Sequence, residues 1–558
     1  MTRSPVHGHT HHQPGWESLR QARWSQARRE FEEALALEQT PEAFEGLGWS
    51  AWWLDDGPTV FQAREHAYAL YRQRGDAAAA GRMATWLAAD ELDFRAGMAA
   101  ASGWLARASR LLTSAPAGPD QGWLAFHAGY FAAVQGKGDE AEAHGSRAAE
   151  IGQQFGVPDL EMLGLALRGS VLVSRALIEE GMRCLDEATT MALAGEANIP
   201  ISCAWTCCFL VSACTSSLDL QRAFEWCDRI AEFSQRYGSR YMLAFCRAEY
   251  GTIFLWRGQW SQAEQMLESS VQDFTHSRPA MVSSPLLALA ELRRRQGRTE
   301  EAEGLIDRVG AGPRASLIRA RLAMDRGEPR RSIEIVDRLL RQLPAHDQLA
   351  RIPALELLVR VRLAVGDTDA AATALRELRQ LQQTIGTLPM QATGDRAAGM
   401  FAAAAGELGQ GRSLLEDAVD GFCRSGAPFE EAVTRIELAS ALRAAGDLAA
   451  ARQELGRARR QLSKLGAQGE AARAGRLMAE LPGRVGRRMG QLTPRERAVL
   501  GILALGLTNQ QIGERLGISE HTVHRHVTNI LRKLELPSRA AAAARAAHFG
   551  LGPVGGAP

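Results

Sequence analysis

A short stretch near the C-terminus carries side chains suited to contact nucleic acid. From Glu520 to Leu534, polar and basic residues alternate with apolar ones at helical spacing. The donors and acceptors of the polar residues match the base edges and phosphate oxygens of a DNA major groove. They are His521, Thr522, His524, Arg525, Thr528, Asn529 and Arg532. We therefore expect this segment to be a recognition helix.

The residues before this segment predict how it is held in place. A first amphipathic helix runs to Gly517, which ends it because glycine adopts positive φ without strain. Ser519 then offers its hydroxyl as an N-cap for a second helix that begins at Glu520. The second helix has an apolar face that must pack inward, formed by Val523, Val527, Ile530, Leu531 and Leu534. Two helices joined in this way form a helix-turn-helix unit.

Two more helices are expected to flank this unit. Pro494 suits the first turn of a helix, which Gly506 ends. Downstream, Pro537 should stop the recognition helix, and Ser538 can cap a fourth helix that extends to Phe549. The Ala-rich body of the fourth helix offers small residues for close helix–helix contact.

The motifs of this region resemble the LuxR-type helix-turn-helix domain. They are Leu492-Thr493-Pro494-Arg495-Glu496, then Gly506-Leu507-Thr508-Asn509-Gln510-Gln511-Ile512, then Ile518-Ser519-Glu520-His521-Thr522-Val523-His524-Arg525-His526-Val527. The resemblance covers roughly the last eighth of the chain. It implies a four-helix domain that binds double-stranded DNA as a homodimer through the fourth helix, with Ala542 and Ala546 as dimer contacts. The family usually has lysine where this chain has His524, which replaces a fixed charge with a titratable one.

We expect a larger set of residues to contact DNA. Arg525, Thr528, His524 and Arg532 would reach bases or phosphates, and hydroxyls, amides and helix N-termini would anchor the phosphates. The full set is Thr508, Asn509, Gln510, Ser519, Glu520, His521, Thr522, His524, Arg525, His526, Thr528, Asn529, Arg532 and Lys533. Two other interpretations remain open: the promoter-reading domain of sigma factors, and a helical pair that binds no nucleic acid.

The distribution of charge favours nucleic-acid binding. Residues 484–549 contain eleven Arg or Lys against four Glu, a net charge of +7. The whole chain has a net charge of +1, so the remainder carries about −6. A cationic module on a mildly acidic body is the arrangement that phosphate neutralisation favours. A solvated basic surface would show the same charge, but would not need the helix-turn-helix pattern.

Most of the 558 residues precede this module, and their pattern repeats. A turn glycine followed by small residues recurs about every forty positions: Gly258 to Gly297 is 39, Gly327 to Gly366 is 39, and both following intervals are 40. The interval from Gly297 to Gly327 is shorter, at 30. Such a period predicts stacked helical hairpins in a superhelical solenoid with a concave groove. The segments resemble tetratricopeptide repeats, although the period exceeds the thirty-four residues usual for them.

The expected fold class is therefore all-α, with a tetratricopeptide-like solenoid followed by a small four-helix LuxR-type domain. The predicted organisation is a disordered His-rich tail at 1–15, a repeat array at 16–480, a linker at 481–490, the DNA-binding domain at 491–552 and a flexible tail at 553–558. Pro482 and three glycines should let the DNA-binding domain swing relative to the array.

Two side-chain clusters in the array have both a packing and a binding interpretation. All twelve Trp lie between Trp16 and Trp260, and Trp49, Trp52 and Trp53 are the densest group. We expect them mainly to fill gaps between helices, with a ligand or partner surface as the alternative. Seven of the eight Cys lie between Cys184 and Cys246. We expect these to pack as small apolar residues, and a redox or soft-metal site is the alternative.

The sequence also disfavours several classes of protein. We find no P-loop, no Gly-x-Ser-x-Gly elbow and no His-Glu-x-x-His, which predicts a non-enzyme without a cofactor or metal. No apolar leader or run of eighteen apolar residues indicates secretion or a membrane span, so a cytoplasmic location is expected. We expect a sequence-specific DNA-binding transcriptional regulator whose array senses a protein or small-molecule effector. The alternative is a repeat-based interaction scaffold with accessory DNA binding.

Overall fold

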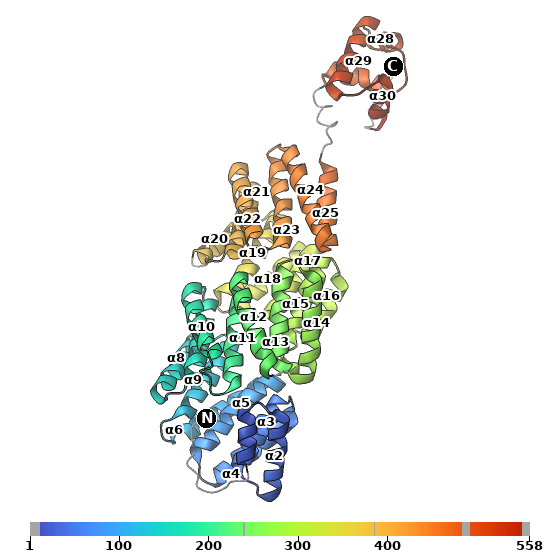
Figure 1. The fold of residues 1–558 in the computed structure, drawn as a ribbon. Helices are drawn as coiled ribbons and strands as arrows, with labels where there is room; N and C mark the ends of the chain where they lie inside the picture. The colour runs from blue at the N-terminus through green and yellow to red at the C-terminus, as the bar shows by residue number, and fades with distance from the viewer. Residues whose placement is uncertain (1–11, 238–239, 384–385, 482–491, 549–558) are drawn as a thin grey trace.

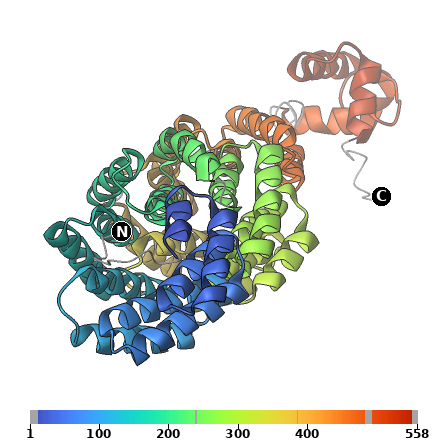
Figure 2. The ribbon, with the colours of Figure 1, turned by 60° about the horizontal axis from the view of Figure 1, so that its bottom comes forward.

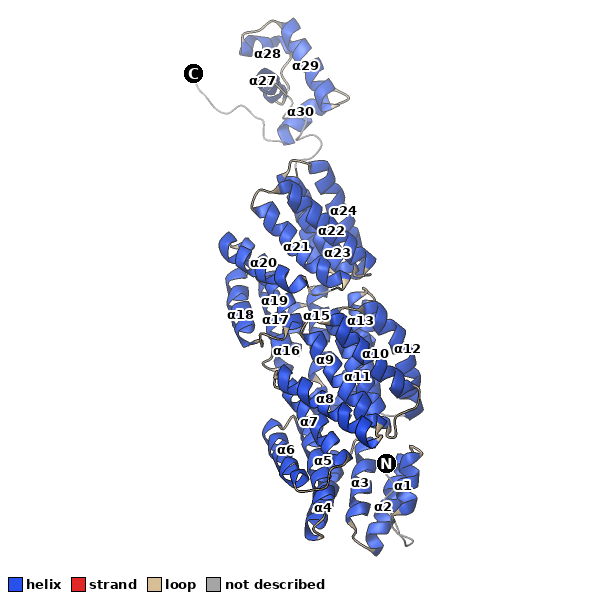
Figure 3. Cartoon of the chain, turned by 90° about the vertical axis from the view of Figure 1, so that its left-hand side faces the viewer, coloured by secondary structure: helices blue, strands red, loops and turns tan. Residues whose placement is uncertain are grey.

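A computed structural model describes residues 12–237, 240–383, 386–481 and 492–548 (Figure 1). The secondary structure of these residues consists of helices and their connecting turns, as the cartoon in Figure 3 shows. The all-α prediction is therefore confirmed. Residues 1–11 of the predicted tail at 1–15 lie outside the described residues, as do the predicted tail at 553–558 and the predicted linker apart from Leu481.

The N-terminal half of the array is built from the following helices. They are α1 Gln13–Arg20, α2 Trp24–Leu37, α3 Pro41–Trp53, α4 Gly57–Gln73, α5 Ala77–Arg95, α6 Met98–Thr113, α7 Pro119–Val134, α8 Gly138–Phe155, α9 Pro158–Ser174, α10 Ile178–Leu193, α11 Pro200–Ser217, α12 Leu220–Tyr237, α13 Arg240–Trp256 and α14 Trp260–Ser277, followed by the 3-10 helix η1 Pro279–Met281. The first helix starts three residues before Trp16, where the sequence pattern placed the start of the array.

The remaining helices complete the array and form the C-terminal domain. They are α15 Ser283–Gln296, α16 Thr299–Val309, α17 Pro313–Asp325, α18 Pro329–Gln342, α19 Gln348–Ala364, α20 Thr368–Gln382, α21 Leu388–Ala404, α22 Leu408–Arg424, α23 Pro428–Ala444, α24 Leu448–Leu465 and α25 Gln468–Glu480, then α27 Pro494–Leu503, α28 Asn509–Leu516, α29 Glu520–Leu534 and α30 Arg539–His548. Leu481, expected to begin the linker, is buried in the core of the last array hairpin.

Consecutive helices of the array pack against each other as antiparallel pairs. The periodic glycines mark turns inside these pairs: Gly258 separates α13 from α14, and Gly366 separates α19 from α20. Both have positive φ, +75° and +76°, which glycine adopts without a Cβ clash. The short interval before Gly327 arises because α16 and α17 have only 11 and 13 residues. The predicted hairpin period is confirmed.

Successive turns of the superhelix contact one another, which a simple nearest-neighbour stack does not require. Arg278 donates to Asp55 Oδ1 at 2.6 Å, across 223 positions of sequence. Thr387 donates its hydroxyl to the carbonyl of Ser217 at 2.8 Å, and Arg295 reaches Glu430 at 3.0 Å. Figure 2 shows the array curling so that distant segments come together. The array is thus a closely wound superhelix.

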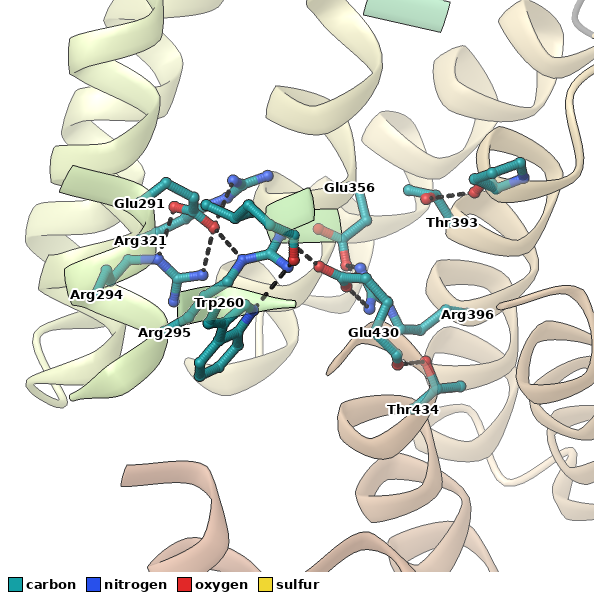
Figure 4. Close-up of polar contacts among 12 residues, drawn as sticks. Trp260, Glu291, Arg294, Arg295, Arg321, Glu356, Thr393, Arg396, Glu430 and Thr434 are labelled. Atoms are coloured by element: carbon teal, nitrogen blue, oxygen red, sulfur yellow. Dashed lines mark hydrogen bonds and ion pairs between the residues drawn. The ribbon is translucent and has the colours of Figure 1, made fainter. Parts of the chain in front are cut away.

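Charged side chains lie between helices α15, α19, α21 and α23 in the C-terminal half of the array (Figure 4). Arg295 on α15 donates to Glu291 at 2.9 Å and to Glu430 on α23. Arg396 on α21 joins Glu430, at 2.6 Å, to Glu356 on α19, at 3.1 Å. Burial alone would raise the pKa of Glu430, but the two arginines lower it to about 2. Paired charges therefore link α15, α19, α21 and α23 at this place.

Most side chains of the tryptophan and cysteine clusters are buried in the hydrophobic core. Trp52 and Trp53 are 2% and 8% exposed, as the packing interpretation predicts. Cys203, Cys207 and Cys214 are free thiols buried in the main hydrophobic cluster. Among the described residues no group of three or more His, Cys, Asp or Glu is arranged to hold a metal ion.

One helix of the described chain, α11, is long and apolar enough to cross a membrane by length and composition alone. Within the protein, 61% of that stretch is buried. The helix packs between α9, α10, α12 and α13. The apolar composition of α11 is therefore that of a helix in the core of the array.

Candidate nucleic-acid interface

The four C-terminal helices surround a hydrophobic core of their own. Val499 and Leu500 on α27 meet Ile512 on α28 and Val523 and Ile530 on α29, all at most 1% exposed. The predicted inward face of α29 is confirmed, with Leu531 only partly buried. Because α28 and α29 pack directly on each other, the helix-turn-helix unit is a rigid element of this core.

Local hydrogen bonds fix where these helices begin. The Thr493 hydroxyl accepts the Glu496 amide at 3.2 Å, and the Glu496 carboxylate accepts the Thr493 amide at 2.7 Å. Thr508 and Gln511 form the same reciprocal box at the start of α28. At the start of α29, Ser519 accepts the Thr522 amide at 3.2 Å. The predicted N-cap at Ser519 and helix start at Glu520 are confirmed.

The turn between the two helices also follows the sequence prediction. Gly517 has φ +64°, in the left-handed region that glycine favours. The recognition helix, however, ends before Pro537: its last helical residue is Leu534, and Glu535 takes a left-handed conformation with φ +49°. Ser538 caps α30 by accepting the Ala541 amide at 3.2 Å, as predicted.

The outer face of α29 presents the expected recognition residues to solvent. His521, His524, Arg525, Thr528 and Arg532 are all exposed. None of the other predicted DNA contacts is buried either. Thr528 donates its hydroxyl to the His524 carbonyl at 3.0 Å, whereas no side-chain hydrogen bond or ion pair holds Arg525 within the described part of the chain. This face combines cationic, imidazole and hydroxyl groups on one rigid helix, which suits insertion into a major groove.

Some of the predicted contact residues have partners inside the domain. The Asn509 side-chain oxygen accepts a hydrogen bond from Arg539, which also donates to the Leu507 carbonyl. Lys533 donates to the Glu496 carboxylate at 2.6 Å. The sequence pattern did not predict these two pairs. Arg539 lies 30 positions from Asn509, and Lys533 lies 37 positions from Glu496, so each pair forms only when the helices pack.

The Lys533–Glu496 pair links α29 to α27. Glu496 is only 3% exposed. Burial by itself raises the pKa of Glu496, but the hydrogen bonds from Lys533 and the Thr493 amide hold it below its usual value. The carboxylate is therefore charged at neutral pH and depends on Lys533 for a counter-ion.

We expect Lys533→Met to destabilise the C-terminal domain by about 1–3 kcal/mol, the usual cost of an unsatisfied buried polar group. Hydrogen exchange of residues 494–534 in the full chain would report this as faster exchange. Arg532→Met is the matched control, because Arg532 is exposed on the same helix. Equal exchange in the two variants would show that the pair does not stabilise the domain.

The expected dimer contacts require a correction. Ala542 and Ala546 are 0% exposed and lie in the core of the domain, so they cannot form a surface for a second copy. These residues are one turn apart on the side of α30 that packs on α27 and α29. The exposed side of α30 instead carries Ala540 and Ala544, which are also one turn apart.

Residues 490–546 match the family model described as bacterial regulatory proteins, luxR family. The nitrate/nitrite response regulator protein NarL of Escherichia coli (strain K12) is 51% identical over 57 residues, which are 10% of this chain and 26% of that protein. The DNA-binding transcriptional activator DevR/DosR of Mycobacterium tuberculosis (strain ATCC 25618 / H37Rv) is 42% identical over 72 residues, 12% of this chain and 33% of that protein. The chain thus spans about a quarter to a third of the length of these relatives.

Solved structures also align with most of the chain, at low identity. The crystal structure of the APC/C hetero-tetramer Cut9-Hcn1 aligns with 82% of this chain and 95% of that chain, with a TM-score of 0.34 and 11% identity. The Rap protein complexed with competence and sporulation factor aligns with 77% of this chain and 96% of that chain, with a TM-score of 0.35 and 13% identity.

Proposed function

We propose that this chain, whose C-terminal domain is a luxR-family helix-turn-helix domain, is a sequence-specific DNA-binding transcriptional regulator controlled by its helical array. The observation that carries the proposal is the outer face of α29, where Arg525, His524 and Arg532 project from a helix fixed by its own core. Base edges and phosphates are the groups that such a face would contact.

The proposed roles of the interface residues depend on whether another residue of the domain already binds the side chain. Arg525, His524, Thr528 and Arg532 would contact bases or phosphates directly. Thr508, Ser519 and Thr522 would offer helix N-termini to the phosphate backbone. Asn509 and Lys533 are held by Arg539 and Glu496, so substituting them would act largely through the structure of the domain.

The array would receive the signal, either from a protein or from a small molecule, in the cytoplasm. The array forms most of the chain, and its hydrophobic cores are separate from the core of the DNA-binding domain. Ligand binding to the array therefore does not require the DNA-binding domain to unfold. The proposed regulator is not an enzyme, and its array would act by changing how the C-terminal domain engages DNA.

A repeat-based scaffold is the second candidate function. An open groove between α14, α15 and α16 favours it, because Val271, Leu286, Leu289 and Leu305 give the groove an apolar floor. In that case DNA binding would only localise the protein. Deletion of residues 1–480 distinguishes the two functions: a changed response at a target promoter supports regulation, and loss of a bound partner alone supports the scaffold.

Genome-wide DNA binding of the full-length protein tests the primary function. Discrete sites that share a sequence would support the proposed regulator and supply its operator. Enrichment without a common sequence, or no enrichment, would contradict sequence-specific regulation. A symmetric operator with two half-sites would further support binding as a homodimer.

Dimerisation through α30 makes a separate prediction. Ala544→Glu should weaken operator binding about tenfold or more while leaving the domain folded, because it places a charge on the exposed face of the helix. Ala542→Glu is expected to unfold the domain, since it buries a charge in the core. Operator titrations combined with far-ultraviolet circular dichroism measure both effects. Unchanged affinity in the Ala544→Glu variant would exclude this face as the dimer surface.

A further inference from the structure

An open groove lies between α14 and α16, and α15, which packs against both helices, forms its floor (Figure 1). Its volume is about 420 Å³, within the range of about 300–1,000 Å³ that small-molecule sites occupy. Gly304 on α16 lines the groove, and a Cβ placed on it would meet no other helix within 4 Å. The space is therefore open to a ligand. We call it the α16 groove; among the residues that line it are Glu268, Val271, Leu289, Glu301, Leu305 and Arg308.

The middle of the α16 groove is apolar. Val271 on α14 and Leu305 on α16 line its two sides and are partly exposed. Leu286 and Leu289 of α15 form the floor and are 1% and 4% exposed. An apolar group in this space would remove the remaining surface of Val271 and Leu305 from water, which favours its binding.

One end of the α16 groove is acidic. Glu268 and Glu301 line it, and their side chains are 58% and 50% exposed. Arg293 on the floor lies 3.3 Å from Glu268 and 3.5 Å from Glu301. The closest partner of Arg293, however, is Glu264, and Arg298 pairs with Glu301 at 2.6 Å. Three carboxylates thus share two guanidinium groups, which leaves one negative charge at this end.

The other end of the α16 groove carries a free arginine. Arg308 is exposed, and no hydrogen bond or ion pair holds its side chain within the described part of the chain. Glu301 and Arg308 are seven positions apart, which places them on one side of α16 and about 10 Å apart along its axis. A ligand that pairs with both ends must therefore carry a cation and an anion at about that separation.

We propose that the α16 groove binds a short apolar peptide with free termini, with its ammonium group at Glu268 and Glu301 and its carboxylate at Arg308. Three residues in extended conformation span at most about 10 Å, which matches the separation of the two charges. Apolar side chains of the peptide would cover Val271 and Leu305. The volume also favours a small occupant over a folded partner, since stable protein interfaces extend over much wider surfaces.

This inference names the chemical class of the effector, and it rests on the proposed function only for its regulatory meaning. Four peptides test the ligand's features on the full-length protein without DNA, by ligand-observed nuclear magnetic resonance. They are trileucine with free termini, N-acetyl-trileucine, trileucine amide and triglycine. Trileucine should bind saturably. The acetylated and amidated peptides each lack one charge and should bind at least about threefold more weakly, as for an exposed ion pair. Triglycine keeps both charges but has no apolar side chains, so it should bind at least about tenfold more weakly.

Filling the α16 groove tests its location. Gly304→Phe should weaken trileucine binding at least about tenfold, because the ring would occupy the apolar middle. Gly304 lies inside α16 without positive φ, and phenylalanine is a better helix former than glycine, so this variant should be at least as stable as the parent. Gly103→Phe is the matched control, since Gly103 is exposed inside α6 and its Cβ would also meet open space. The control should bind like the parent, and circular dichroism during denaturation shows that both variants are folded.

A charge variant assigns the orientation of the peptide. In Arg308→Met the carboxylate of trileucine has no partner, so trileucine and its amide should bind equally. The acetylated peptide should still bind more weakly than trileucine, because the acidic end is unchanged. In Glu268→Gln the penalty for acetylation should shrink, while the penalty for amidation should persist.

Three results would overturn the inference. They are no saturable binding of trileucine at millimolar concentration, equal binding of trileucine and triglycine, and unchanged binding in a folded Gly304→Phe variant. A dimer of the full-length protein that becomes monomeric in Gly304→Phe but not in Gly103→Phe would place a second copy in the groove and also overturn it.

Operator binding measured on the same preparations separates the two proposals. A protein that binds its operator but no peptide retains the regulatory function and loses only this site. A protein that binds trileucine but no operator retains the site and contradicts the proposed regulator.

Discussion

Replacing Arg525 and Arg532 together with alanine is expected to weaken operator binding by about a hundredfold, because a single base contact contributes about 1–3 kcal/mol and each phosphate contact adds to it. Both side chains are exposed on α29. Arg525 makes no competing interaction within the described residues, whereas Arg532 contacts Asn529 at 3.4 Å. Their removal should leave the domain core, which contains neither residue, intact.

Salt dependence separates the roles of the two arginines. If both contact phosphates, the slope of log affinity against log salt should decrease in magnitude by about 2 in the double variant, since each phosphate contact contributes about 0.9. If Arg525 reads a base, the slope should fall by about 1, and discrimination between operator and mutated operator should relax. Each single variant measured on both DNAs assigns the two roles.

The control for this experiment is Arg412→Ala. Arg412 is exposed on α22 of the array and pairs with Glu416 at 2.8 Å, far in sequence from α29. The change removes one positive charge from the whole chain, as each single variant on α29 does, without touching the interface. Operator affinity in this variant should match that of the parent. An equal loss in the control and the double variant would mean that net charge, and not the α29 face, drives binding.

The second large effect is expected at Arg278, which joins the N-terminal helices to the middle of the array. Its guanidinium donates to Asp55 Oδ1 at 2.6 Å and to the Trp52 carbonyl at 3.1 Å. It also lies 3.8 Å from the ring centre of Phe94 and 4.7 Å from that of Trp52. Arg278→Met keeps much of the volume but leaves the Asp55 carboxylate without its partner. We expect the N-terminal half to lose about 3–5 kcal/mol of unfolding free energy.

Tryptophan fluorescence during denaturation is the appropriate measurement, because all twelve Trp lie between Trp16 and Trp260. The signal therefore reports the N-terminal half specifically. The double variant Arg278→Met with Asp55→Asn should recover much of the loss, since neither charge then remains buried alone. Equal destabilisation in the single and double variants would show that stacking on the rings, and not the ion pair, holds these turns together.

Local chemistry made much of the DNA-binding domain predictable. Ser519 and Gly517 act through hydrogen bonds and φ angles within a few residues, so the start of α29 and the end of α28 follow from the sequence. The apolar spacing of Val523, Val527 and Ile530 likewise fixes the buried face. The outer face, and with it the candidate interface, is simply the remainder of the same helix.

The buried side of the fourth helix, α30, could not be predicted from the sequence. Its body is almost entirely alanine, so no contrast between apolar and polar positions indicates which side packs inward. The tertiary structure places Ala542 and Ala546 in the core and leaves Ala540 and Ala544 outside. The end of α29 is similar: Pro537 was expected to stop the helix, but the helix ends earlier, at Leu534, where Glu535 takes a left-handed conformation.

By itself, the sequence determined the helical class of the chain, the forty-residue hairpin period marked by glycines such as Gly366, and the capped recognition helix. Each depends on residues that are close in sequence. Only the tertiary structure decided that Arg278 pairs with Asp55 across 223 positions and that Asp93 is buried. The small rotation between successive hairpins, summed over many of them, sets which distant side chains meet, and no local pattern encodes that sum.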